Sequence, residues 1–212
     1  MSEETRHLLE RARELMYSTG AFKTGDFTLS SGKRSSYYLD SKLFSLDPEG
    51  SELLGELLYT LVADADVSVI GGMAHAAIPL VAVVSNVSHR KKNPLPSFYV
   101  REERKEHGTM KQVEGHAPKR GESVAVLDDV VTTGGSINKA ISAVEEGEGK
   151  VAKVITLLER HEGGAEQLRE KYNFVSVFAT DEQGNLLISY PGYEETTDSP
   201  QPAYVLSASP RS

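Results

Sequence analysis

Between residues 67 and 178 the chain alternates short apolar runs with amphipathic segments, and this alternation restricts the fold more than any other feature. The apolar runs are mostly continuous, as in strands that are buried on both faces. Strands connected by helices in this way form a sheet with helices on both sides. We predict an α/β fold, a mostly parallel sheet flanked by helices, with strands at Val67–Ile70, Ser97–Val100, Val124–Leu127, Val151–Leu158 and Phe174–Phe178, and helices at Ile78–Asn86, Ile137–Glu146 and Glu162–Tyr172.

Smaller elements precede this region. Residues 3–17 carry apolar side chains at helical spacing, and residues 22–40 are typical of two short strands around a Ser30–Lys33 turn. Asp47, Pro48 and Glu49 indicate the start of a further helix, because they supply an N-cap, a proline at the first position and an acid in the first turn. From Tyr190 onward the chain is rich in Pro, Ser, Glu and Thr, which predicts a loosely held or disordered tail.

Charge and composition exclude several functions. The 212 residues carry a net charge of −8, which argues against nucleic-acid binding through a basic face. The absence of cysteine excludes disulfides and thiolate metal sites. The first residues lack the layout of a signal peptide, and no apolar run approaches the roughly 20 residues that span a bilayer. We therefore expect a soluble, cytoplasmic protein that binds neither nucleic acid nor membranes.

The segment from Val124 to Ser136 is the strongest indication of a ligand. Its apolar run leads into Asp128 and Asp129, and the small residues Thr132, Thr133, Gly134, Gly135 and Ser136 follow before the next helix. Small residues at a helix start allow backbone N–H groups to converge on a phosphate. Two carboxylates just before such a cradle suit the vicinal hydroxyls of a ribose. An acidic loop with a glycine turn is the alternative, and the complete order of residues disfavours it.

Residues at the ends of four predicted strands point to one site. Ligands of parallel sheets bind beyond the carboxyl ends of the strands. Gly71, Arg101, Asp128 and Arg160 all stand at such ends. We expect their loops to share one pocket.

The Val124–Ser136 segment resembles the phosphoribosyl pyrophosphate (PRPP) signature of the type I phosphoribosyltransferases. Other segments narrow the resemblance to the orotate phosphoribosyltransferases, over about residues 1–180. It implies transfer of a phosphoribosyl group from PRPP to orotate with Mg²⁺, which gives orotidine 5′-monophosphate and pyrophosphate. It also implies one compact domain, with an amino-terminal helix and small hood (1–45), a core (46–180) and a carboxy-terminal strand or tail (181–212).

The resemblance assigns the ribose and 5-phosphate sites. Asp128 and Asp129 would hold the ribose hydroxyls, directly or through the ion. We expect the rest of the PRPP site to be formed by Val130, Val131, Thr132, Thr133, Gly134, Gly135 and Ser136. No protein cage for a metal is predicted, so Mg²⁺ would arrive with PRPP, with Asp128 or Asp129 as a contact through water.

Residues 99–115 resemble the family's catalytic loop. The resemblance implies that Arg101, Lys105 and His107 contact the pyrophosphate, and that Lys105 and His107 are catalytic together with Asp128 and Asp129. In the family this loop reaches a neighbouring subunit, which implies a homodimer with the loop 101–115 at the partner's site. A solvated surface hairpin is the alternative for such a charged run.

Two segments resemble the family's base site. Phe27–Asp40 is similar to the family's hood segment, where Tyr37 and Tyr38 would offer a stacking face to a pyrimidine, although an ordinary strand also explains a tyrosine pair. Leu158–Gly164 is similar to a turn in which Arg160 would bind the carboxylate of orotate, because a guanidinium matches a carboxylate in bidentate geometry. Thr132 is expected to contact orotate as well.

Two departures from the family pattern keep a second hypothesis open. Glu102 stands where the family usually carries a lysine, and Ala76 and Ala77 replace residues of the loop before Ile78. A PRPP-binding regulatory protein without turnover is therefore the alternative to an enzyme. Transfer to another base is a third possibility, which Arg160 disfavours.

Overall fold

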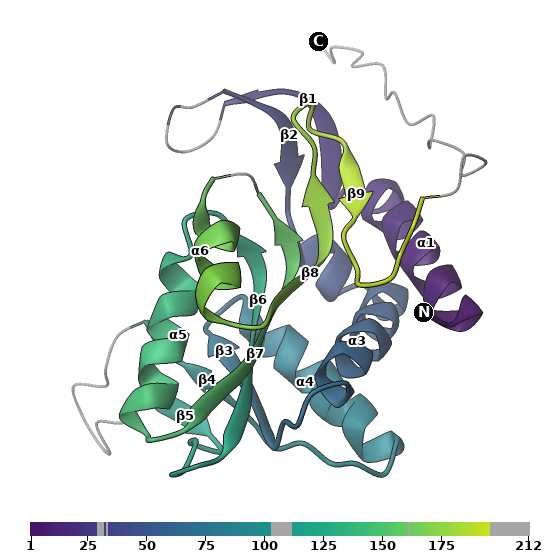
Figure 1. Ribbon diagram of the computed structural model, residues 1–212. Coiled ribbons are helices and arrows are strands. Elements are labelled where there is room, and N and C mark those ends of the chain that lie inside the picture. The colour runs from purple at the N-terminus through teal and green to yellow at the C-terminus, as the bar shows by residue number, and fades with distance from the viewer. Residues whose placement is uncertain (29–31, 33, 103–111, 161, 196–212) are drawn as a thin grey trace.

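A seven-stranded sheet forms the centre of the protein, in the strand order β5-β4-β3-β6-β7-β8-β9 (Figure 1). The structure is a computed structural model, and it describes residues 1–28, 32, 34–102, 112–160 and 162–195. Parallel pairing joins the five inner strands, whereas the two edge strands are antiparallel to their neighbours. The inner strands are β3 (Val69–Met73), β4 (Ser97–Val100), β6 (Ser123–Val131), β7 (Lys150–Glu159) and β8 (Phe174–Thr180), and the edges are β5 (Val113–Gly115) and β9 (Leu186–Ile188).

Helices cover both faces of the sheet, as the sequence predicts (Figure 1). Alternate residues of β6 belong to different apolar cores, because successive strand residues point to opposite faces. Ala125 and Leu127 pack with α1 (Glu3–Ser18), α3 (Pro48–Ala63) and α4 (Ala77–Arg90). Val124 and Val126 pack with α5 (Gly135–Glu146) and α6 (Gly164–Lys171). The same alternation decides where the acidic side chains of β6 point.

The amino-terminal strands β1 (Phe22–Thr28) and β2 (Arg34–Leu39) form a separate antiparallel pair, which we call the hood. The short helix α2 (Lys42–Ser45) connects the hood to α3. In Figure 1 the hood lies beside the β8–β9 hairpin. Gly184, in the turn between β8 and β9, has a φ of +85° and lies close to β2. A Cβ at this position would lie 2.2 Å from Ser36 Oγ. The hood is therefore held against the carboxyl end of β8.

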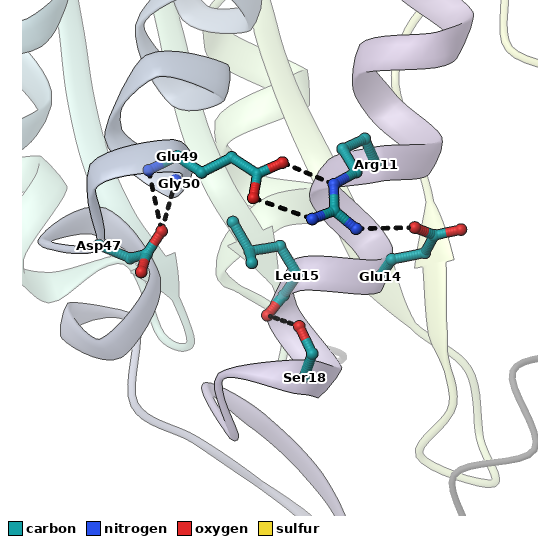
Figure 2. Close-up of polar contacts among 7 residues, drawn as sticks. All are labelled: Arg11, Glu14, Leu15, Ser18, Asp47, Glu49 and Gly50. Carbon is teal, nitrogen blue, oxygen red and sulfur yellow. Dashed lines mark hydrogen bonds and ion pairs between the residues drawn. The ribbon is translucent and has the colours of Figure 1, made fainter.

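Polar contacts fix α1 against the start of α3 (Figure 2). Asp47 caps α3 by accepting from the N–H groups of Glu49 and Gly50, at 3.0 and 2.9 Å, so the predicted helix start is confirmed. Arg11 donates from Nε and Nη2 to the two oxygens of Glu49, at 2.6 and 2.9 Å. These hydrogen bonds from Arg11 hold the pKa of Glu49 below its ordinary value. The contacts join two helices that bury their apolar faces in the same core.

Several predicted boundaries differ from those of the structure, among them the end of β3 at Met73 rather than Ile70. Strand β6 continues to Val131 rather than ending at Leu127, because its pairing with β7 extends through Val131 opposite Glu159. The prediction of a loose tail from Tyr190 fails for residues 190–195, since Tyr190 is 6% exposed and its hydroxyl donates to the carbonyl of Leu57. Residues 196–212 lie outside the described residues. In the part of the chain that the structure describes, no helix has the length and apolar character needed to cross a membrane.

Candidate active site

Four of the predicted site residues lie toward the carboxyl edge of the sheet. Arg101 directly follows β4 and Arg160 directly follows β7, while Asp128 and Asp129 lie inside the last part of β6. Gly71, by contrast, is buried within β3, where a Cβ would lie 2.1 Å from the ring of Phe98. Packing therefore requires glycine at this position. Because Gly71 lies in the middle of β3, its predicted place at the strand end is wrong.

The β6–α5 junction forms an open helix start. The N-cap of α5 is Gly134 in a left-handed conformation with φ +81°, and no side chain caps the helix. The first helical N–H groups of any helix lack partners inside the helix, and they carry the positive end of its dipole. Thr133, Gly135 and Ser136 are exposed at this point. Helix starts of this kind bind phosphate in other proteins. That this junction does so stays a prediction.

A second glycine turn, at Gly163 and Gly164, packs against the backbone of the predicted phosphate cradle, Thr132–Ser136. The N–H of Gly164, the first residue of α6, donates to the carbonyl of Thr132 at 3.0 Å. A Cβ on Gly164 would lie 2.4 Å from that carbonyl oxygen and 2.6 Å from the carbonyl carbon of Thr133. Only glycine permits this approach, so the Gly163-Gly164 turn has a packing role that the sequence did not reveal.

The two aspartates of β6 point in opposite directions. Asp128 is on the same side as Val126, faces α5, and accepts from the hydroxyl of Ser136 at 2.7 Å and from the N–H of Asp129 at 3.0 Å. Asp129 points to the connection between the hood and α2, where its carboxylate accepts from the hydroxyl of Ser41. The two side chains lie on opposite faces because both residues belong to an extended strand rather than to a loop. Their joint assignment to the ribose hydroxyls stays a prediction.

Burial also distinguishes the two acids. Asp128 is 3% exposed, whereas Asp129 is half-buried. Desolvation raises the pKa of Asp128 to about 6, and the negative charge of Asp129 acts in the same direction, while the hydrogen bond from Ser136 opposes both. Asp128 thus titrates close to neutral pH, within a hydrogen-bonded link between β6 and the cradle.

A cavity of about 300 Å³ lies at the ends of β3 and β4 and is lined by Ala74, His75, Ile78, Tyr99, Arg101 and Glu102. The adjoining helix α4 also begins without a side-chain cap, at Ala76. Arg101 Nε is buried and has no hydrogen-bond partner among the described residues, and its Nη1 lies 3.7 Å from Glu114. Arg101 and the helix start favour an anion here, whereas the exposed carboxylate of Glu102 opposes one.

Arg160 meets the hood at Tyr37. Its Nε donates to the Tyr37 hydroxyl at 2.6 Å, and its guanidinium carbon lies 4.8 Å from the centre of the Tyr37 ring. That ring is 8% exposed and stacks on Phe22 at 5.4 Å. The prediction that Tyr37 offers an open stacking face is therefore wrong, because its ring is already occupied. Tyr38, at 44% exposed, keeps an accessible ring.

Comparisons with known proteins agree with this arrangement. The phosphoribosyl transferase domain family matches residues 47–186. The orotate phosphoribosyltransferase of Rhodopseudomonas palustris (strain TIE-1) is 41% identical over 153 residues, which cover 70% of this chain and 81% of that protein. The Methanopyrus kandleri protein of the same name is 41% identical over 162 residues, which cover 76% of this chain and 84% of that protein. The chain belongs to the orotate phosphoribosyltransferase family.

Solved structures of orotate phosphoribosyltransferases share the fold. The Mycobacterium tuberculosis H37Rv protein in complex with Fe(III) dicitrate superposes with a TM-score of 0.69 at 34% identity, covering 85% of this chain and 99% of that one. The same protein in complex with PRPP gives a TM-score of 0.64 at 32% identity, covering 82% of this chain and 95% of that one. These likenesses confirm the predicted type I phosphoribosyltransferase fold.

Two residues of the site, Ser41 and Thr180, were not predicted from the sequence. Ser41 and Thr180 contact Asp129 and Tyr37, respectively, from elements distant in the sequence. Thr180 lies beyond the predicted end of its strand, and Ser41 lies in a short segment without a motif, so neither gave a signal. Lys105 and His107 lie outside the described residues.

Proposed function

We propose that this protein transfers the 5-phosphoribosyl group from PRPP to orotate, giving orotidine 5′-monophosphate and pyrophosphate in pyrimidine nucleotide synthesis. A ring nitrogen of orotate forms a bond to C1 of the ribose as the bond from C1 to the pyrophosphate oxygen breaks. The observation that carries the proposal is the β6–α5 junction, where an uncapped helix start follows Asp128 and Asp129. Family membership and the position of Arg160 support the choice of orotate.

The 5-phosphate is assigned to the cradle. Backbone N–H groups from Thr132 to Ser136, with the hydroxyls of Thr132 and Thr133, would surround its oxygens, while the hydroxyl of Ser136 donates to Asp128. We include Val130 and Val131 in the PRPP site because they lead β6 into the cradle. The contact of Gly164 with Thr132 keeps this backbone in place before any ligand binds, which lowers the entropic cost of binding.

The opposite directions of the two acids give them different roles. Asp129 is half-buried and is the better candidate to bind the ribose hydroxyls. When the ribose binds, it would replace the present contact of Asp129 with Ser41. Asp128 is buried and holds Ser136 at the start of α5, so it would act mainly by orienting the cradle. A carboxylate near the sugar also stabilises the positive charge that develops at C1 in the transition state.

The pyrophosphate is assigned to the cavity beside Arg101. The uncapped start of α4 and the Arg101 guanidinium would offset the negative charge of the leaving group. By resemblance to the family's loop, Lys105 and His107 would add charge and a proton where negative charge develops, and would exclude water from the site. Arg101 would leave its weak contact with Glu114 when the pyrophosphate binds.

Orotate is assigned to the space between Arg160 and the hood. The guanidinium of Arg160 would bind the carboxylate, which a purine lacks. Tyr38 presents an exposed ring on which the flat pyrimidine would stack, and Thr132 would contact the base from the cradle. Tyr37 would act through Arg160 rather than by stacking, since Phe22 and Arg160 already occupy its ring.

Mg²⁺ fits this site as an ion brought by PRPP. Among the described residues, no three His, Cys, Asp or Glu side chains are grouped closely enough to hold a metal. Asp129 is the half-buried carboxylate available beside the proposed ribose position, so it would contact the ion directly or through water. When bound, the ion would neutralise charge on the pyrophosphate.

We also propose a homodimer in which the loop 101–115 reaches the partner's site. The loop begins and ends at one edge of the sheet, because two hydrogen bonds join Arg101 and Gln112. The Arg101 N–H donates to the Gln112 carbonyl at 2.9 Å, and the side-chain amide of Gln112 donates from Nε2 to the Arg101 carbonyl at 3.1 Å. Equilibrium sedimentation would test the dimer. A monomer at assay concentrations would overturn it.

A PRPP-binding protein without turnover is the second candidate, and Glu102 favours it. Its exposed carboxylate lines the cavity assigned to the pyrophosphate, where it repels the leaving group. Ala76 and Ala77 stand where α4 begins, between the cavity-lining residues His75 and Ile78.

One assay separates the two candidates. The purified protein is mixed with PRPP, Mg²⁺ and orotate, and orotate consumption is followed by its absorbance. The enzyme proposal expects turnover that requires both substrates and that Arg160→Ala abolishes or shifts to a much higher orotate KM. PRPP binding without turnover would overturn the proposal in favour of the regulator, and normal orotate kinetics in Arg160→Ala would reassign that residue.

A further inference from the structure

The hydroxyl of Tyr37 lies at a junction of three elements that are far apart in the sequence. It accepts a hydrogen bond from Arg160 Nε at 2.6 Å, after β7, and another from Thr180 Oγ1 at 3.3 Å, at the end of β8. Tyr37 itself belongs to β2 in the hood. Tyr37 is 8% exposed and Thr180 is 2% exposed, so water competes little for these contacts.

We propose that Tyr37 and Thr180 are positioning residues that set the direction of Arg160 and thereby the selectivity for a pyrimidine that carries a carboxylate. The inference rests on the proposed role of Arg160 in binding orotate. It adds that the guanidinium depends on a phenolic hydroxyl for its orientation.

The geometry of a guanidinium explains why one contact has this effect. A carboxylate can bind either to Nε and one terminal nitrogen or to the two terminal nitrogens. With the Nε–H of Arg160 donated to Tyr37, the pair of terminal nitrogens remains for a bidentate contact. The Tyr37 hydroxyl thus selects one of the two binding modes of the guanidinium.

The same contact competes with an internal acid. Glu162 Oε1 lies 3.5 Å from Arg160 Nε, close enough for an ion pair. Without the Tyr37 hydroxyl, Nε would be available to Glu162, whose carboxylate would then imitate the substrate's. The hydroxyl therefore keeps Arg160 available for a ligand.

Tyr37 is rigid enough to orient a flexible arginine. Its ring stacks on Phe22 with an interplanar angle of 16°, and a Cβ on Gly184 would lie 3.1 Å from its Cδ1. These contacts from β1 and from the β8–β9 hairpin restrict the ring. Because a long side chain that is already ordered loses less entropy on binding, the clamp favours orotate affinity.

The test measures orotate and PRPP kinetics for Tyr37→Phe and Thr180→Val. Tyr37→Phe keeps the ring but removes the hydroxyl, and it should raise the orotate KM about tenfold, as the loss of one hydrogen bond to a charged group implies. The PRPP KM should change far less. Thr180→Val should have a smaller effect in the same direction, and Thr180→Ser should restore the wild-type value.

A double-mutant cycle shows whether the hydroxyl acts through Arg160. On an Arg160→Ala background, Tyr37→Phe should have no further effect on the orotate KM or on the dissociation constant of orotate. Tyr190→Phe is the matched control, since it removes another buried tyrosine hydroxyl, bonded to Leu57 away from this site, and should leave orotate kinetics unchanged.

The outcomes distinguish this inference from the proposed function. If Arg160→Ala leaves orotate kinetics normal, the assignment of Arg160 fails, and the inference fails with it. If Arg160→Ala is impaired but Tyr37→Phe and Thr180→Val match the wild type, the inference alone is overturned. An equal effect of Tyr37→Phe with and without Arg160 would also overturn it. Should Tyr37→Phe fail to fold, the Thr180→Val and Thr180→Ser pair decides.

Discussion

Replacing Asp128 by asparagine should stabilise the fold while impairing the enzyme. Burial places the pKa of Asp128 at about 6 instead of 3.8. A tenfold change in proton affinity corresponds to about 1.4 kcal/mol, so the ionised carboxylate costs the folded protein about 3 kcal/mol relative to the neutral one. Asparagine is neutral and nearly the same size, so it avoids this cost.

The hydrogen bonds of Asp128 can survive the substitution. The amide oxygen would still accept from the N–H of Asp129, and the amide nitrogen would donate to the hydroxyl oxygen of Ser136. The expected gain in unfolding free energy is therefore about 2–3 kcal/mol at pH 7.5, which corresponds to roughly 4–12 °C in Tm for a chain of this size.

The gain must depend on pH. Because the folded-state pKa is raised, Asp128 contributes its full stability below the unfolded value of 3.8 and loses it as pH rises through about 6. The Asp128→Asn variant should thus have the same unfolding free energy as the wild type near pH 4. Its unfolding free energy should exceed that of the wild type by an increasing amount between pH 4 and 6, and by a constant amount above pH 6.

Urea denaturation at a series of pH values measures this difference directly. Asp129→Asn serves as the matched control, because it removes a carboxylate at the next position that is only half-buried. A stability difference for Asp128→Asn that is the same at pH 4.5 and pH 7.5 would refute the burial of an ionisable Asp128. Turnover should fall, because a carboxylate is lost beside the cradle.

Three further predictions concern the cradle and the leaving group. Gly164→Ala should destabilise the fold by about 1–3 kcal/mol and raise the PRPP KM, because the new Cβ would lie 2.4 Å from the carbonyl oxygen of Thr132; unchanged urea denaturation and PRPP kinetics would contradict the packing role. Glu102→Lys should lower the PRPP KM severalfold, and Glu102→Gln should have a smaller effect, because both remove a negative charge from the cavity beside Arg101; equal PRPP kinetics in all three proteins would place the pyrophosphate elsewhere. Lys105→Ala should reduce kcat by roughly 10²-fold while PRPP remains bound in a titration; an unchanged rate would remove Lys105 from the mechanism.

Features with a local signature were predicted well. The strand Ser97–Val100 has the predicted bounds, and the helix start at Asp47 is the predicted one. Apolar periodicity and N-cap residues act within a few positions of the chain, so they can be read without knowing the fold. The small residues Thr132–Ser136 likewise indicated an open helix start, because glycine and hydroxyl residues have definite backbone preferences there.

Features that depend on pairing between distant segments were not predicted. The aspartates of β6 looked like loop residues because their side chains are polar, yet pairing with β7 keeps them extended up to Val131. The same holds for Tyr37, whose ring is covered by Phe22 and whose hydroxyl meets Thr180. The local sequence does not determine which distant segment pairs with a strand or packs against an aromatic ring.

By itself, the sequence determined the fold class, through the alternation of apolar runs and amphipathic segments over residues 67–178. It also indicated the kind of ligand, because the strand, the two acids, the glycine turn and the helix start follow one another within Val124–Ser136. Only the tertiary structure decided that Asp128 faces α5 with its pKa raised to about 6, that Asp129 contacts Ser41, and that the Tyr37 hydroxyl accepts from Arg160. The physical reason is that side-chain direction and desolvation depend on neighbours brought together by sheet register and hood docking, which are long-range contacts.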